Sequence, residues 1–248
     1  MHRNRWTTYS GFSGRLAPES VVAFDRITQR VQELIKNFDK YLEIYTKRGP
    51  FGKPGQLEYH RRTIELRRNA GSVINAINED DFIWSLYETL RFWGMDSQGA
   101  HRAPFSKFKD ELRLKANLIS AFDGIRIDDP QLDIHKKSSE LWQIMKSLKI
   151  NINRTKLVAC SKTLHHILPD FVVPIDRSYT GTFFEKTSDS AFDNNQENTF
   201  IFSMKYFASI ARATNPIRFV GKGWNTCQTK IIDNAIVGLL MARQYNIS

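Results

Sequence analysis

Cysteine is scarce in this sequence: among 248 residues there are two, Cys160 and Cys227, and neither lies in a CxxC pair. A disulfide scaffold and a cysteine-based zinc site are therefore not expected. We predict that both thiols lie in the core of a protein from a reducing compartment.

Long apolar runs are missing as well, since none approaches the roughly 20 residues of a membrane span. The polar N-terminus lacks the apolar segment of a signal peptide. We therefore expect a cytoplasmic protein without a membrane partner. The nucleotide, zinc and hydrolase motifs GxxxxGK[ST], GxGxxG, HExxH and GxSxG do not occur. Adjacent His165 and His166 make a poor chelating pair, so no cofactor and no metal site are expected.

The chain is rich in positive charge and in hydrophobic residues. Lys and Arg number 36 against 26 acidic residues, for a formal charge of +10. Such an excess favours a polyanionic partner, nucleic acid first, through neutralisation of its phosphates. Hydrophobic residues make up 41% and aromatic residues 12%, with 17 Phe, which is ample for a core and excludes a disordered chain.

The strongest periodic signal follows Pro18. Apolar residues recur there at steps of three and four from Phe24 to Tyr45, which predicts one helix of about six turns. Gly49 and Pro50 end it. The next segment is dominated by cations and predicts either a solvated helix face or a surface for backbone phosphates. Those cations are His60, Arg61, Arg62, Arg67 and Arg68.

Further helices are predicted after a cap at residues 78–81, after a cap at Ser106, over 156–168, over 200–213 and after a cap at Asn225 or Thr226. Sustained two-residue alternation is missing, so no sheet is expected. We predict a mainly α, non-bundle fold of about eight to ten helices with a cleft between two helical lobes. Residues 1–17 are expected to form a basic arm, and residues 18–248 one helical domain or two lobes in close contact, 18–150 and 151–248.

The chemistry is concentrated between residues 154 and 184. A helix there buries an apolar face and places Lys162 and His166 one turn apart on another side. Pro169 ends this helix, and Pro174 keeps the crossing extended as far as Asp176. Asp176 stands where a new helix begins, so it is predicted to cap backbone N–H groups, a position that also favours a negative charge.

The segment SKTLHHILPDFVVPIDRSYTGTFF resembles the catalytic segment of the helix-hairpin-helix (HhH-GPD-like) DNA glycosylases. In that family a Lys-Thr helix precedes an apolar crossing and an Asp that starts the next helix. Here Asp176 follows Lys162 by 14 residues, a shorter spacing than the family's, and NRTKLVACS has no glycine where the family has a Gly-rich hairpin. The segments LYETLRFWGMD, PIDRSYT and NTCQTKIIDNAI also resemble a bacterial group that excises modified bases from phage DNA.

The resemblance implies a DNA glycosylase of anti-phage defence that flips a modified base out of double-stranded DNA and hydrolyses its N-glycosidic bond. It implies Asp176 as the catalytic carboxylate and Lys162 as a second catalytic residue. A carboxylate suits this reaction because the sugar becomes oxocarbenium-like, and an everted base needs aromatic walls. Candidate base-pocket or intercalating residues are Trp93, Met95, His166, Tyr179 and Trp224, and candidate phosphate ligands are Arg102, Arg177 and Lys222.

Two other functions fit the same sequence. A non-catalytic nucleic-acid-binding module or sensor would use the basic charge without releasing a base. A metal-dependent nuclease would need convergent carboxylates, and the acids between Asp123 and Asp133 are expected in a surface turn instead. Near the C-terminus, Lys230 and Asp233 lie one turn apart, and we predict that they form an internal ion pair.

Overall fold

The computed structural model describes residues 18–49, 51–96, 101–185, 195–221 and 223–247, so the predicted arm at 1–17 lies outside it. The described residues form eleven α-helices and one 3-10 helix without a strand, with a single bridge between Arg102 and Asn151. The mainly α class is thereby confirmed, with slightly more helices than expected. None of the described helices combines the length and the apolar character that a membrane span requires.

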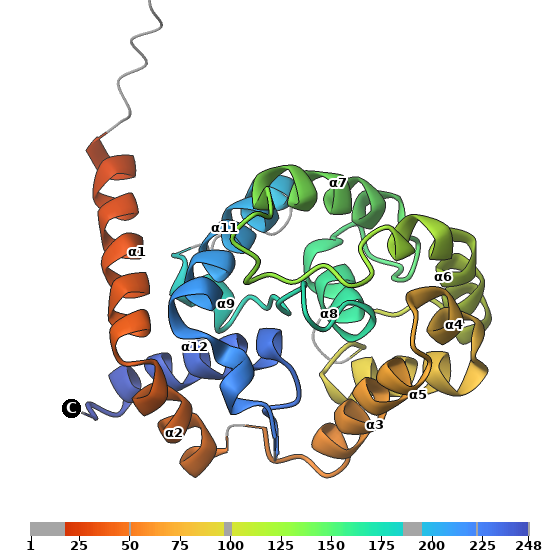
Figure 1. The fold of residues 1–248 in the computed structure, drawn as a ribbon, viewed down its shortest axis with the longest axis horizontal. Helices are drawn as coiled ribbons and strands as arrows, with labels where there is room; N and C mark the ends of the chain where they lie inside the picture. The colour runs from red at the N-terminus through yellow and green to blue at the C-terminus, as the bar shows by residue number, and fades with distance from the viewer. Residues whose placement is uncertain (1–17, 50, 97–100, 186–194, 222, 248) are drawn as a thin grey trace, which may run out of the picture.

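The helices follow one another along the chain as Figure 1 shows. Their bounds are α1 (Pro18–Lys36), α2 (Phe38–Arg48), α3 (Gln56–Asn69), α4 (Val73–Asn78), α5 (Asp80–Phe92), α6 (Phe105–Ser120), α7 (Ile134–Ser147), α8 (Leu157–Ile167), α9 (Thr180–Phe183), α11 (Gln196–Thr214), the 3-10 helix η1 (Pro216–Phe219) and α12 (Gln228–Gln244).

The long helix predicted from Pro18 to Tyr45 is two helices, because the chain leaves the helical conformation at Asn37, with φ −117° and ψ 29°. The Asn37 side chain donates to the carbonyl oxygen of Glu33 at 3.1 Å. Asn competes with the helix backbone through such local bonds. The apolar stripe continues across the break, since Leu34 and Phe38 are both buried.

The two ends of the described chain pack together. Helix α2 lies along α12, and Gly238 in the middle of α12 meets the backbone of Tyr41 so closely that a Cβ there would overlap the Tyr41 carbonyl oxygen. Helix α1 stands at the side of the molecule in Figure 1 and buries Ile27, Val31 and Leu34. A division of the chain at residue 150 would place the packing partners α2 and α12 in different lobes.

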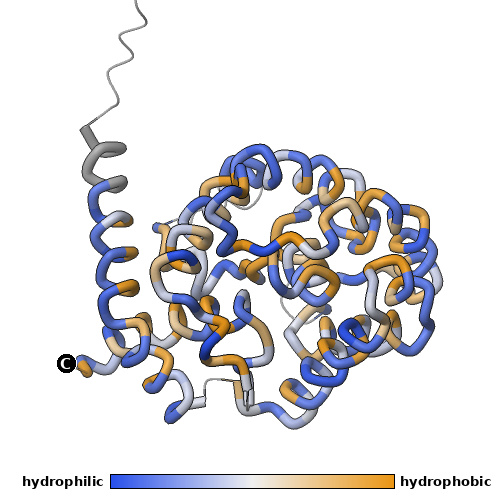
Figure 2. Tube along the Cα trace, in the orientation of Figure 1, coloured by the Kyte–Doolittle hydropathy of each residue, from blue (hydrophilic) through white to orange (hydrophobic). Residues whose placement is uncertain are grey.

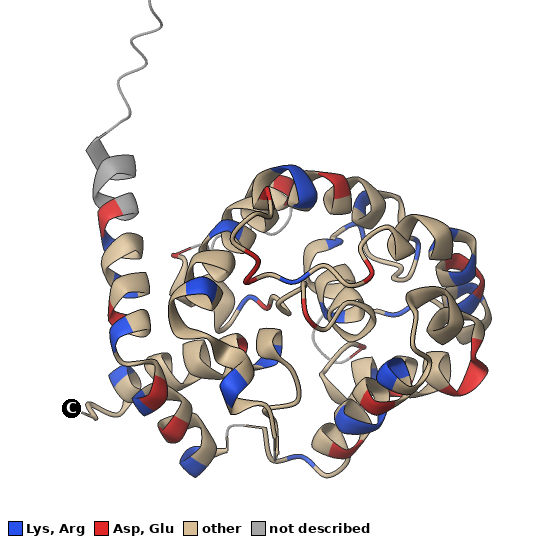
Figure 3. Ribbon diagram, viewed as in Figure 1, with Lys and Arg blue, Asp and Glu red and all other residues tan. Residues whose placement is uncertain are grey.

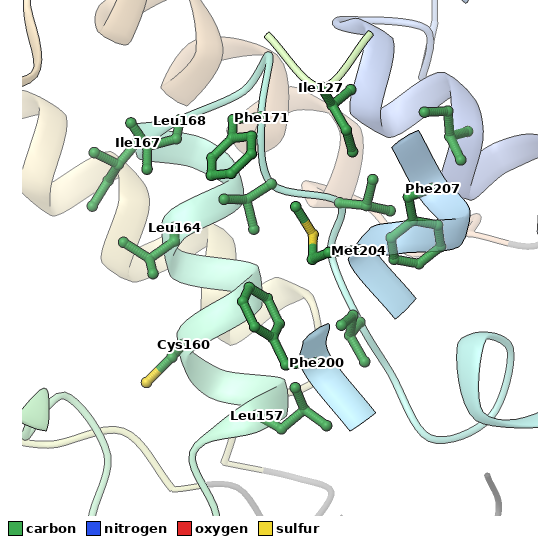
Figure 4. Close-up of a cluster of buried hydrophobic side chains, with 14 of the residues drawn as sticks. Ile127, Leu157, Cys160, Leu164, Ile167, Leu168, Phe171, Phe200, Met204 and Phe207 are labelled. Carbon is green, nitrogen blue, oxygen red and sulfur yellow. The ribbon is translucent and has the colours of Figure 1, made fainter. Parts of the chain in front are cut away.

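On the other side of the molecule, α3 packs on α5 and α4 packs on α6, while α7 packs on α11. Helix α8 lies near the centre with its apolar face on the core, where Leu157, Leu164 and Phe200 are fully buried (Figure 4). Figure 2 shows hydrophobic and hydrophilic positions alternating around the helices, as helices with one buried face require. Both cysteine thiols are free and buried, as predicted.

Two helix starts differ from the prediction. Helix α6 begins at Phe105 after Pro104, so Ser106 lies inside its first turn and caps nothing. Helix α12 begins at Gln228 after Cys227, without a side-chain cap. Thr226, predicted as a cap, instead places its hydroxyl 2.7 Å from Nε2 of His60, so a tertiary contact replaces the local one.

Candidate functional site

The first turn of α12 projects Lys230 into a group of aromatic rings. Its Nζ lies 5.2 Å from the ring centroids of Phe51, Trp93 and Trp224. These rings come from the segments before α3, after α5 and before α12, and Tyr179 packs edge-on against Phe51 with the centroids 5.9 Å apart. We call Phe51, Trp93, Tyr179 and Trp224 the aromatic cluster. Three rings from separate chain segments therefore surround one cation, and Tyr179 from a fourth segment packs against one of them.

Lys230 and Asp233 form the internal ion pair that the sequence predicts. Lys230 Nζ lies 2.5 Å from Asp233 Oδ2, and both side chains are buried. Burial raises the pKa of Asp233, while the ammonium of Lys230 opposes the shift. The nearby carboxylate of Asp176 adds to the rise. Asp176 and Asp233 therefore belong to one charged group.

Asp176 follows the buried residues 171–175 of the crossing and is itself partly exposed. Its Oδ1 accepts a hydrogen bond from the backbone N–H of Tyr179 at 2.6 Å. Helix α9 begins at Thr180, four residues later than predicted, so Asp176 caps the turn that leads into the helix. The hydrogen bond holds the carboxylate in one orientation at the edge of the aromatic cluster.

Lys162 lies on α8 and donates a hydrogen bond of 3.3 Å to the carbonyl oxygen of Trp93. Burial lowers the pKa of Lys162, and the carboxylates of Asp176 and Asp233 oppose that shift. The structure thus brings both predicted catalytic residues to one place, together with the Lys230–Asp233 pair.

Three histidines form a second cluster directly beside the aromatic one. His60, His165 and His166 are fully buried, and His60 Nδ1 lies 3.0 Å from His166 Nε2. The imidazole of His60 stacks on Trp224 with the ring centroids 5.5 Å apart. Burial lowers the pKa of His166 to about 4, and it lowers the pKa of His60 and of His165 well below the usual value. All three imidazoles are therefore neutral at pH 7.

The prediction of a cationic surface at residues 60–68 is wrong for His60 and Arg67, which are both buried. Arg67 donates to the carbonyl oxygen of Ile167 at 2.7 Å and pairs with Asp123 at 2.5 Å. The spacing held a usable signal, because His60, Ile64 and Arg67 share one helix face with Thr63. Ile64 is the one apolar residue among these four, so the pattern did not predict that this helix face is buried.

A groove of about 660 Å³ opens beside α3. Phe51 and Trp224 of the aromatic cluster form one part of its wall, and the exposed side chains of Lys53, Arg61 and Arg62 form another. Figure 3 shows the basic residues of α3 interspersed with its glutamates. Asp176 and Lys162 do not line this groove, whereas Phe51 and Trp224 line it and also face Lys230 of the charged group.

The predicted base-pocket residues divide into two sets. Trp93, Tyr179 and Trp224 belong to the aromatic cluster, and His166 lies under it in the histidine cluster. Met95 is a core residue with 2% of its surface exposed, so it offers no open surface to a base.

The three predicted phosphate ligands do not form one group in the structure. Arg102 is engaged within the protein, where its guanidinium pairs with Asp96 at 2.6 Å and lies 3.8 Å from the ring centroid of Tyr87. Its side chain is 7% exposed, which leaves little of it for a phosphate. Arg177 is exposed and adjoins Asp176 in the chain. Lys222 lies outside the described residues.

Carboxylates do not gather into a metal site within the described ranges. The one convergent group of possible metal-binding side chains found there is His60, His165 and His166. Of the acids considered for a nuclease, Asp123 pairs with Arg67, and Asp128 pairs with Arg126 at 2.8 Å.

Comparison of the chain with protein-family models, with curated proteins and with solved structures finds no match. The candidate site therefore stands on its own geometry: two carboxylates, two lysines and four aromatic rings beside a buried histidine cluster and a basic groove.

Proposed function

We propose that this protein is a DNA glycosylase that binds an everted base at the aromatic cluster and hydrolyses its N-glycosidic bond with Asp176. The observation that carries the proposal is the position of Asp176, a partly exposed carboxylate beside Lys162 and the aromatic cluster. A modified base in phage DNA is the proposed substrate, and anti-phage defence the proposed setting.

The chemistry asks for a carboxylate near the reacting sugar. Loss of the base leaves an oxocarbenium-like sugar, which a fixed carboxylate stabilises while it orients the attacking water. The hydrogen bond from the Tyr179 N–H pre-orients Asp176 for this role. Lys162, whose pKa burial lowers, supplies a proton donor or a nucleophile on the same side of the cluster.

DNA binding would use the groove beside α3. The exposed guanidinium groups of Arg61 and Arg62 and the ammonium of Lys53 suit backbone phosphates. Phe51 and Trp224, which the groove and the aromatic cluster share, offer rings on which an unstacked base can lie. A flipped nucleotide would thereby pass from the groove toward Asp176, which requires the Phe51 and Trp224 side chains to move apart.

The test is base release from duplex DNAs that carry different modified bases, with abasic sites revealed by alkali and the freed base identified by mass spectrometry. Asp176→Asn keeps an oxygen for the Tyr179 N–H but removes the charge. We expect it to lower the excision rate by about 100-fold or more with an unchanged melting temperature. Asp133→Asn is the matched control, because Asp133 caps α7 in the same manner, at 3.0 Å from the N–H of Lys136.

Equal excision by the wild type and by Asp176→Asn would reject the catalytic assignment. A non-catalytic nucleic-acid-binding module is the second candidate, and the capping bond to Tyr179 favours it, because it gives Asp176 a purely structural task. That candidate is supported if the wild type binds DNA in a salt-dependent manner and releases no base from any duplex.

A further inference from the structure

We propose that His60, His165 and His166 together bind one divalent transition-metal ion, with Zn²⁺ as the first candidate. One ligand atom from each ring lies within 4.8 Å of the others. Two nitrogens bound to the same tetrahedral zinc lie about 3.3 Å apart, and His60 Nδ1 and His166 Nε2 are already 3.0 Å apart. A small rotation of the rings would accommodate the ion. This proposal does not depend on the glycosylase proposal.

The outer nitrogen of each ring has a partner that fixes its orientation. His166 Nδ1 donates to the carbonyl oxygen of Lys162 at 2.8 Å, which leaves Nε2 as the ligand atom. His165 Nδ1 donates to the carbonyl oxygen of Val172 at 2.9 Å, which leaves its Nε2. Thr229 supports that tautomer: it donates to the carbonyl oxygen of Pro169 at 2.6 Å, so its oxygen can accept from His165 Nδ1.

His60 completes the arrangement through its contact with Thr226. Its Nε2 lies 2.7 Å from the Thr226 hydroxyl, so Nδ1 faces the other two rings. Metal binding would move the His60 proton from Nδ1 to Nε2, which then donates to Thr226, and no proton leaves the site. A second hydrogen-bonding partner on the distal nitrogen is typical of histidines that bind metal ions.

Two buried atoms without a hydrogen-bond partner at the histidine cluster also support a bound metal ion. Within the described part of the chain, the buried atoms His165 Nε2 and Trp93 Nε1 have no hydrogen-bond partner. A metal ion would take the lone pair of His165 Nε2. Trp93 lies against all three imidazoles, with its ring centroid 4.8 Å from that of His166, so a water on the fourth position of the ion would supply an acceptor for its N–H.

Charge permits an ion here. The imidazoles are neutral ligands, since burial lowers the pKa of each. Lys230 is the cation that bears on all three histidines, and it is paired with Asp233. Lys162 is the other neighbouring lysine, and the carboxylates of Asp176 and Asp233 act on it. The ion would join α3 to α8 beneath Trp93 and so hold the floor of the aromatic cluster.

The test uses the untagged full chain, stripped with a chelator and titrated with Co²⁺ and with Zn²⁺. We expect one ion per chain, visible d–d bands of four-coordinate Co²⁺, imidazole scattering in the X-ray absorption spectrum of the zinc form, and a melting temperature raised by several degrees. His60→Gln and His165→Gln should each lose the Co²⁺ bands. His135→Gln, a change at an exposed histidine of α7, should keep them.

Less than one-tenth of an ion per wild-type chain would overturn the proposal, as would Co²⁺ bands that persist unchanged in both His60→Gln and His165→Gln. The wild-type stoichiometry and absorption spectrum decide the matter even if a variant fails to fold. Base release by wild-type protein is measured separately, so failure of the metal site and failure of the glycosylase are distinguishable.

Discussion

The ammonium of Lys230 lies 2.5 Å from the carboxylate of Asp233, and the two side chains are 3% and 8% exposed. Removing one member of a buried pair leaves the other charge buried without compensation, which costs about 3–5 kcal/mol. We therefore expect Lys230→Met to lower the free energy of unfolding by about that amount, measured by urea denaturation. Lys47→Met, which breaks the exposed pair with Glu43, should leave the urea midpoint unchanged. Equal losses in the two variants would contradict this.

Stability should fall in mild acid because of the histidine cluster. Burial lowers the pKa of His166 from 6.5 to about 4. Above pH 6.5 this histidine is neutral in both states; as the pH falls toward 4, the unfolded chain takes up a proton that the folded chain does not. By pH 5 the loss from one such histidine is about 2 kcal/mol, and His60 and His165 shift in the same direction.

The measurement is the urea midpoint at pH 7.5 and at pH 5, with chelator present. His166→Gln should reduce the difference between the two midpoints, whereas His135→Gln should retain it. A wild-type midpoint that does not move between the two pH values would refute the prediction.

Packing between α2 and α12 depends on Gly238. A Cβ at this position would overlap the carbonyl oxygen of Tyr41, and backbone cannot move aside as a flexible side chain can. We expect Gly238→Ala to destabilise the fold by about 3 kcal/mol or more. Gly221→Ala is the control, since no atom lies within 4 Å of a Cβ there. Thermal unfolding of both variants measures the difference, and equal melting temperatures would disprove the close approach.

Neither thiol should react in the native protein. Burial raises the pKa of Cys160 to about 12 and also raises the pKa of Cys227, so the thiolate is rare and inaccessible. A chromogenic disulfide reagent at pH 8 should titrate both thiols only after unfolding. Ser106→Cys, at an exposed position, should add one thiol that reacts at once in the folded state. Rapid reaction of the wild type would show that the core opens easily.

Arg61 and Arg62 should dominate DNA binding if the groove holds the duplex. Replacing both with Gln should weaken binding and reduce the slope of log K against log salt by about 0.9 for each lost phosphate contact. The control is Lys146→Gln with Lys149→Gln, a pair of exposed lysines in and after α7. A larger effect from the control pair would place the DNA on another face.

Sequence periodicity predicted most helices because their apolar faces repeat at helical steps. The one-turn spacing of Lys230 and Asp233 predicted their ion pair, which the structure confirms. Periodicity could not divide the first helix at Asn37, since the apolar stripe runs through the break. The boundary is a departure from helical dihedral angles at one residue, Asn37, which leaves the apolar pattern unchanged.

The histidine cluster could not be predicted from the sequence for a different reason. His60 is 106 residues from His166, and only tertiary packing brings the two imidazoles together. Followed directly by Arg61 and Arg62, His60 has the local setting of a surface residue. Arg102 was misjudged in the same direction: its loop looked open, but Asp96 and Tyr87 hold the guanidinium.

The packing of α2 on α12 has a consequence for synthesis. Tyr41 of α2 packs against Gly238 of α12, which lies nearly two hundred residues later in the chain. The ribosome must therefore synthesise α12 before the apolar side of α2 can be covered by it. Until α12 is synthesised, α2 exposes hydrophobic surface to solvent. Nascent chains stalled before α12 should accordingly recruit chaperones, and they should release them once the last helix emerges.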